Sequence, residues 1–211
     1  MEIRLRLEEE ADYRIVEEVT REAFWNVHQP GADEHFLLHQ LRTKKEFIKA
    51  LDFVAIYEDA IVGNIVYVEL KIKGNDGISY HILTFGPVSV LPRCQSKGIG
   101  SQLINHTISL ARDIGYRAIL IYGDPDYYKR FGFKVSKDYG ITNKDGKYLA
   151  AMQILELYPN ALQGVTGICD EGELYNVNPD EAKVFDANFP HKEKAKTLTQ
   201  ERFNELANKF L

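Results

Sequence analysis

The chain has 211 residues, 45% of them hydrophobic and 11% aromatic, which is enough apolar material for one good core. Its net charge of -5 provides no attraction to nucleic acid or to an anionic membrane. Two isolated cysteines, Cys94 and Cys169, and six histidines that form no paired metal-binding motif predict neither a disulfide framework nor a metal site. We expect a cytoplasmic protein, since no signal-peptide pattern and no apolar stretch of the ~20 residues that cross a bilayer is present.

The first elements follow from hydrophobic periodicity. Residues 3–7 alternate between apolar and charged side chains, which predicts a short strand. Residues 12–25 carry apolar side chains at helical spacing, and the chain breaks at 29–31. A second, shorter helix is predicted over 36–41, with Asp33 as its cap.

The next segments predict the centre of a sheet. Residues 53–57 and 60–71 are strand-like, and the two residues between them predict a hairpin. After a turn, the apolar run 80–90 predicts a buried central strand. Pro87 lies inside that run and cannot donate to a strand ladder, so we expect a bulge or a splay at this point.

A strand, a glycine loop, a helix and a second strand then follow one another. The loop reads Gln95-Ser96-Lys97-Gly98-Ile99-Gly100-Ser101, and the helix over 99–114 stops at Gly115. Residues 117–122 predict the second strand. This order predicts a right-handed parallel crossover.

The later elements are less regular. The sequence predicts a short helix over 126–131 and a strand over 148–157, and the pattern weakens beyond Pro159. The further candidates are strands over 165–169 and 173–175, a surface connection over 186–196, and a helix over 200–210.

The glycine loop has the chemistry of a phosphate site. The first amides of a helix lack internal acceptors, and the helix dipole adds partial positive charge there. Gly98 and Gly100 let the backbone approach a ligand closely, and Lys97 and Ser101 add a charge and a hydroxyl. The loop lacks the lysine of a P-loop and the third glycine of a dinucleotide fingerprint. Taken alone, it is equally compatible with a turn that only packs a helix.

Three motifs in order resemble the GNAT acyl-CoA N-acyltransferases. Gln95-x-x-Gly98-x-Gly100 resembles their cofactor signature, Arg/Gln-x-x-Gly-x-Gly/Ala. The strand over 83–92 is similar to the family's fourth strand, and residues 127–133 resemble its Tyr-x-x-x-Gly-Phe segment. The Gly-Pro-Val, Gly-Asp-Pro and Tyr-Tyr-x-Arg-Phe-Gly-Phe features are similar to those of the bacterial YhbS-like acetyltransferases.

The resemblance implies an α/β fold with a mixed, mostly antiparallel central sheet and helices on both faces. The fourth and fifth strands part in a V, and the pantetheine arm of CoA pairs with the freed backbone there. Residues 1–158 are expected to form the acyltransferase domain, and residues 159–211 a C-terminal extension, a late strand plus a helix, that packs on it or caps it. The expected cofactor contacts are Val88, Ser89, Val90, Gln95, Ser96, Lys97, Gly98, Ile99, Gly100 and Ser101.

The activity that the resemblance implies is direct acetyl transfer from acetyl-CoA to a primary amine. Tyr128 matches the family's general-acid tyrosine, and a phenol stays protonated at neutral pH while it can protonate a leaving thiolate. The adjacent Tyr127 is the other candidate for this role. Helical geometry points the two side chains about 100° apart, so only one of them can face the sulfur. The general base stays unassigned among Glu22, Glu34, Glu69, Asp124, His35 and His39.

Alternatives remain open. A non-catalytic acyl-CoA-binding or regulatory domain would keep the fold without turnover, and a nucleotide-binding protein would use the loop for another phosphate. The expected acceptor is a small-molecule or protein amine, and the expected state is a monomer or homodimer. No nucleic acid, membrane or metal partner is expected.

Overall fold

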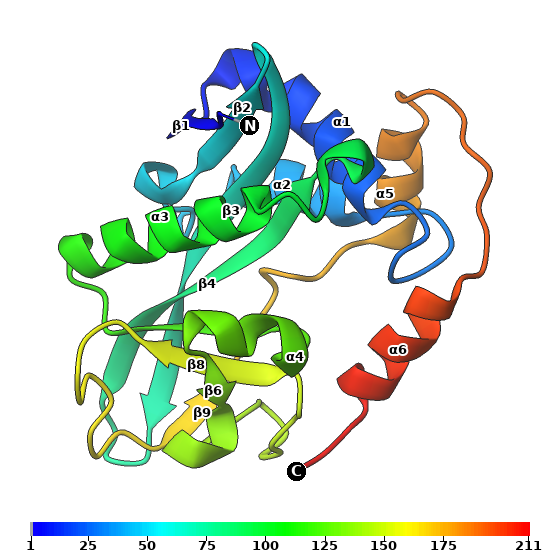
Figure 1. Ribbon diagram of the computed structural model, residues 1–211. Coiled ribbons are helices and arrows are strands. Elements are labelled where there is room, and N and C mark those ends of the chain that lie inside the picture. Colours follow the sequence, from blue (N-terminus) through cyan, green and yellow to red (C-terminus); the bar gives the residue numbers. More distant parts are fainter. Residues whose placement is uncertain (1) are drawn as a thin grey trace.

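The computed structural model describes residues 2–211, which form a nine-stranded mixed sheet with helices on both faces (Figure 1). The main path of the sheet is β1-β2-β3-β4-β5-β8-β6, and β9 pairs with β3 and β7. The strands are β1 (Arg4–Leu7), β2 (Phe53–Tyr57), β3 (Ala60–Gly74), β4 (Ser79–Val90), β5 (Ala118–Tyr122), β6 (Lys134–Val135), β7 (Ile141–Thr142), β8 (Met152–Glu156) and β9 (Gly167–Cys169). The helices are α1 (Tyr13–Phe24), α2 (Glu34–Leu41), α3 (Ile99–Ile114), α4 (Pro125–Tyr128), α5 (Pro179–Asp186) and α6 (Leu198–Ala207).

The predicted hairpin between β2 and β3 is confirmed. Glu58 and Asp59 both have positive φ, 49° and 59°, which is the backbone of the tight turn that matches the twist of two antiparallel strands. The predicted helices at α1 and α2 are confirmed as well. Asp33 occupies the N-cap position of α2, but its side chain makes no capping hydrogen bond.

The predicted irregularity at Pro87 is a bulge between β3 and β4. Phe85 lies opposite Tyr67 and Val88 lies opposite Ile65, so two residues of β4 face one residue of β3. The bulge removes the requirement for a ladder donor at the proline. The strand therefore continues past Pro87 to Val90.

The predicted splay is also present. Among the described residues, β4 and β5 share one registered parallel pair, Leu83 with Ile119. Beyond it β4 runs on to Val90 while β5 turns away to pair with β8. The helix α3 makes the crossover between them and ends at Gly115, whose φ of 101° is a left-handed C-cap.

Helices α1 and α3 cover opposite faces of the sheet. The hydroxyl of Tyr67 lies 2.9 Å from that of Thr107 on α3. Ser89, which pairs with Asn64 of β3, donates to the hydroxyl of Thr20 on α1 over 2.9 Å. Side chains of odd and even residues of one strand point to opposite faces, so these contacts place one helix on each side.

The tail beyond residue 158 contributes to the sheet and to a helical cover. The strand predicted over 165–169 is present as β9, and Leu162 and Val165 are buried in a second apolar cluster beneath it. Residues 173–175, a candidate strand, form a turn instead. Helices α5 and α6 are joined by the long segment 187–197 at the right of Figure 1. The domain boundary at residue 158 stays a prediction.

Helix α5 was not predicted from the sequence. The side chain of Asn178 accepts from the amides of Asp180 and Glu181, and Pro179 occupies the first position of the helix, a regular helix start. None of the helices described in residues 2–211 is long and apolar enough to cross a membrane.

A buried charge cluster ties β1 to α2 and β2. Arg42 lies 2.5 Å from a carboxylate oxygen of Glu8 and 3.1 Å from one of Glu17. Asp52 lies beside Glu8 and accepts from Asn64 over 3.1 Å. Burial, and then the second carboxyl group, raise the pKa of Glu8 to about 9, so Glu8 holds a proton at neutral pH.

This cluster predicts a pH dependence of stability. The pKa of Glu8 is raised in the folded state from about 4.3 in the unfolded chain, so its contribution is complete below pH 4 and is lost as pH rises toward 9. Glu8→Gln mimics the protonated acid and should reduce the fall in unfolding free energy between pH 6 and 9. Urea unfolding at pH 6 and at pH 9 measures this difference, and Glu10→Gln, at an exposed position, is the control. If the unfolding free energy of Glu8→Gln falls as much as that of the wild type, the account is contradicted.

Candidate active site at the splayed strands

The glycine loop presents free amides at the start of α3. Gly98 is the N-cap, with a φ of 83°, and no side chain caps the helix. Among residues 2–211, the amides of Ile99, Gly100 and Ser101 have no hydrogen-bond acceptor, while Gln102 bonds back to the Gly98 carbonyl. A side chain at Gly98 would meet nothing within 4 Å. The loop is therefore an open, electropositive backbone surface.

The free edge of β4 faces the splay beside this loop. The amide of Leu91 donates to the carbonyl of Val62, which makes these residues a hydrogen-bonded pair. Such pairs alternate along an antiparallel ladder, so the amides and carbonyls of Val88 and Val90 point away from β3. In agreement, the side chain of Gln95 donates to the Val90 carbonyl over 3.0 Å. The Val88 backbone and the Val90 amide are left facing the splay.

The other predicted cofactor residues differ in placement. Ser89 turns its backbone toward β3 by the same alternation and its side chain toward α1, so neither faces the splay. Ile99 is buried in the main core. Ser96 has a left-handed φ of 60° and lies on the surface. Lys97 donates to the carbonyl of Arg93 over 2.9 Å, and the half-buried Ser101 lies in the first turn of α3.

A cavity of about 640 Å³ opens at the splay. One wall is formed by residues 84–88 of β4, and another by the end of β5 with Tyr128. Phe24 at the end of α1 and Leu37 of α2 contribute a third wall. The tail closes the remaining side with residues of the 171–175 turn and of α6. The cavity thus adjoins the free edge of β4 at Val88.

Tyr127 and Tyr128 point in different directions. Tyr128 lines the cavity and packs against the rings of Phe85 and Phe133, at 5.9 and 5.7 Å between centroids. Its hydroxyl has no hydrogen-bond partner in the described part of the chain, and burial raises its pKa above the ordinary value. Tyr127 instead approaches Gly100, where an added Cβ would lie 3.4 Å from its hydroxyl. Of the two phenols, only that of Tyr128 lines the cavity.

The six candidates for the general base differ in location and in partners. Glu34 and Asp124 line the cavity. Glu34 lies 2.7 Å from the ring of His28, and Asp124 caps α4. Glu22 and Glu69 lie outside the cavity lining, where Glu22 pairs with Lys192 and Glu69 with His81. Outside the lining as well are His35, buried beside Asp186, and His39, which pairs with Glu17.

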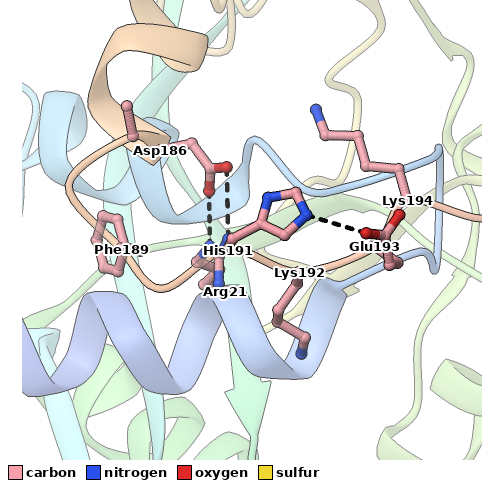
Figure 2. A pocket seen from close by; sticks show the side chains of 8 residues that line it. Arg21, Asp186, Phe189, His191, Lys192, Glu193 and Lys194 are labelled. Carbon is pink, nitrogen blue, oxygen red and sulfur yellow. Dashed lines mark hydrogen bonds and ion pairs between the residues drawn. The ribbon is translucent and has the colours of Figure 1, made fainter.

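A second hollow of about 390 Å³ lies where the tail crosses α1 (Figure 2). Arg21 lines the hollow and is paired with Asp186 over 2.6 Å. Lys192 and Lys194 point in different directions, and His191 pairs with Glu193 over 3.0 Å. Arg21, His191 and Lys192 each pair with a carboxylate, and among residues 2–211 only Lys194 of this group forms no ion pair. Because the positive charges do not converge on one point, we interpret this hollow as a seam that attaches the tail.

Comparison with known families agrees with this geometry. Residues 50–135 match the acetyltransferase (GNAT) domain model. The chain carries a GNAT acetyltransferase domain. The matched range contains β2 to β5, the splay, the glycine loop and Tyr128.

Individual relatives extend the match beyond the GNAT domain. The uncharacterized N-acetyltransferase YhbS of Escherichia coli (strain K12) is 26% identical over 141 residues, 66% of this chain and 81% of that protein. Its crystal structure in complex with CoA has a TM-score of 0.73 at 24% identity and covers 83% of this chain and 92% of that one. A GNAT acetyltransferase from Brucella melitensis, solved with acetyl-CoA, has a TM-score of 0.65 at 28% identity and covers 83% and 99%.

Several cavity residues lie outside the GNAT match and were missed from sequence. Glu171 and Tyr175 come from the turn after β9, and Arg202 and Phe203 come from α6. Glu171 lies in a run of acidic residues and glycine that is typical of an exposed turn. No local signal places it in a cavity, because only the path of β9 along β3 brings it there.

Proposed function

We propose that the protein is an acetyl-CoA-dependent N-acetyltransferase that acts on a primary amine. The splay between β4 and β5 supports this proposal most strongly. There the free backbone of Val88 and Val90 lies between the start of α3, whose first amides are unpaired, and a cavity of substrate size. Both solved relatives named above hold CoA or acetyl-CoA, which supports the same ligand here.

The residues fit the parts of that co-substrate. Phosphate oxygens suit the amides of Ile99, Gly100 and Ser101, because these donors have no acceptor in the described chain and lie at the positive end of α3. The open space at Gly98 lets a ligand approach the backbone. The pantetheine amides suit the free edge at Val88, in the manner of an added strand.

Acetyl-CoA supplies a thioester as the acyl donor. The Val88 amide faces the splay and can donate to the carbonyl oxygen on which negative charge builds. The protonated phenol of Tyr128 lines the same cavity. Burial raises the pKa of its phenol, so the hydroxyl stays protonated at neutral pH, and removal from water raises the pKa of a leaving thiol in the same direction. The phenol therefore remains a suitable proton donor to a leaving thiolate in this cavity.

The assignment of the glycine loop to CoA binding is tested by placing a negative charge in the loop. Gly98→Glu places a carboxylate at the open helix start, so we expect it to abolish measurable CoA binding by calorimetry. Gly146→Glu is a matched control, since Gly146 also has positive φ, 71°, and open space around it, but lies in a distant turn. Equal CoA affinity of both variants and the wild type, all folded, would overturn the assignment of the loop.

The role of Tyr128 as general acid is tested by removing its hydroxyl. Tyr128→Phe keeps the ring on Phe85 and Phe133, and it should lower kcat about 10²-fold or more while CoA affinity changes little. Tyr127→Phe is the control and should have a smaller effect, because Tyr127 faces Gly100. Since the pKa of Tyr128 is raised, the wild type should lose no activity through this group below pH about 10.

Three outcomes would contradict these assignments. If Tyr127→Phe is the damaging change, the acid is Tyr127. If neither change lowers kcat, the thiolate leaves without protonation by a tyrosine. CoA binding without transfer to any amine would favour a regulatory, non-catalytic role.

A further inference from the structure

The tail places one unpaired carboxyl group in the cavity. Glu171 follows β9 by two residues and lines the same cavity as Pro87 and Tyr128. It has no hydrogen-bond or ion-pair partner among residues 2–211. From the same turn, the hydroxyl of Tyr175 lies 3.4 Å from the carbonyl of Gly86, which fixes the turn against the point where β4 bulges.

The other two carboxyl groups of the cavity have partners. Glu34 lies 2.7 Å from His28, whose ring stacks on Phe203 of α6 at 4.2 Å between centroids. Asp124 accepts from the amide of Asp126 over 2.9 Å and lies 3.4 Å from Arg202. Glu171 is therefore the cavity carboxyl group that is free to act on a ligand.

The surroundings of Glu171 suit a proton acceptor at neutral pH. Burial, and then the neighbouring Asp170, raise its pKa to about 7. The titratable groups that face it are Cys169, Tyr122 and Tyr175, each with a pKa raised chiefly by burial. These three stay neutral when Glu171 ionises, so it titrates alone among the side chains that face it, next to the charge of Asp170.

The remaining walls suit an apolar ligand with one cationic end. They are largely aromatic and aliphatic, including Phe24, Leu37, Phe85, Leu149, Phe203 and Leu206. Burial of a charge without a partner is costly. A single free carboxyl group thus matches a single ammonium group, whereas a polyamine would bury a second charge against apolar walls.

We propose that Glu171 is the general base of the reaction and that the acceptor is a small monoamine with an apolar or aromatic body. This inference rests on the proposed acetyl transfer. Glu171 takes one proton from the ammonium group and leaves a neutral amine. The amine nitrogen forms a bond to the thioester carbonyl carbon as the carbon–sulfur bond breaks. Tyr128 gives its proton to the sulfur and recovers one from the nitrogen, and the proton on Glu171 passes to solvent.

The experiment uses 2-phenylethylamine and spermidine as probes on the full chain. Calorimetry without CoA at pH 8 should show that the wild type binds 2-phenylethylamine at least tenfold more tightly than Glu171→Gln does, and more tightly than it binds spermidine. In the transfer assay, Glu171→Gln should lower kcat/KM for 2-phenylethylamine about 10²-fold and remove the acidic limb near pH 7. CoA affinity should stay unchanged.

Glu173→Gln is the matched control, because Glu173 lies two residues away, is exposed and lies outside the cavity lining. Unchanged amine binding, kcat/KM and pH profile in Glu171→Gln would overturn the role of Glu171. Tighter binding and faster acetylation of spermidine would overturn the acceptor class. If the wild type binds no CoA, the proposed acetyl transfer is wrong. The amine-binding measurement needs no CoA, so it still tests the role of the Glu171 carboxyl group separately.

Discussion

The loss of pairing between β4 and β5 is the constraint on which the site depends. Past the Leu83–Ile119 pair the two strands diverge, so the inner edge of β4 keeps backbone groups that no neighbouring strand satisfies. Buried backbone groups of this kind need partners. The bulge at Pro87 and the cavity at the same level of the strand place those groups where a ligand can supply the partners.

The two halves of the proposed site come from different parts of the chain. The matched family range, 50–135, contains the free edge of β4, the glycine loop and Tyr128. The tail contributes the turn with Glu171 and Tyr175, and α6, whose Phe203 stacks on His28. In this account the family range holds the acyl donor, and the tail selects the amine. The same division explains why the family match does not identify an acceptor.

Local signals in the sequence predicted the elements that hold the donor side. A proline in an apolar strand, and glycines between a strand and a helix, restrict the backbone directly, so Pro87 and Gly98 were informative without any tertiary context. The orientation of Ser89 was not predictable in this way, because it depends on which residues of β3 lie opposite it. Glu171 depends on a longer path still, since β9 must pair with β3 before its turn reaches the cavity.

Amide hydrogen exchange with and without CoA tests the central claim most directly. If the freed edge of β4 and the start of α3 hold the co-substrate, saturating CoA should slow exchange at Val88 and Val90 and at residues 99–101. The seam lined by Arg21 and Asp186 should be unaffected. Binding verified by calorimetry, with no protection at β4 or at the start of α3, would contradict the account.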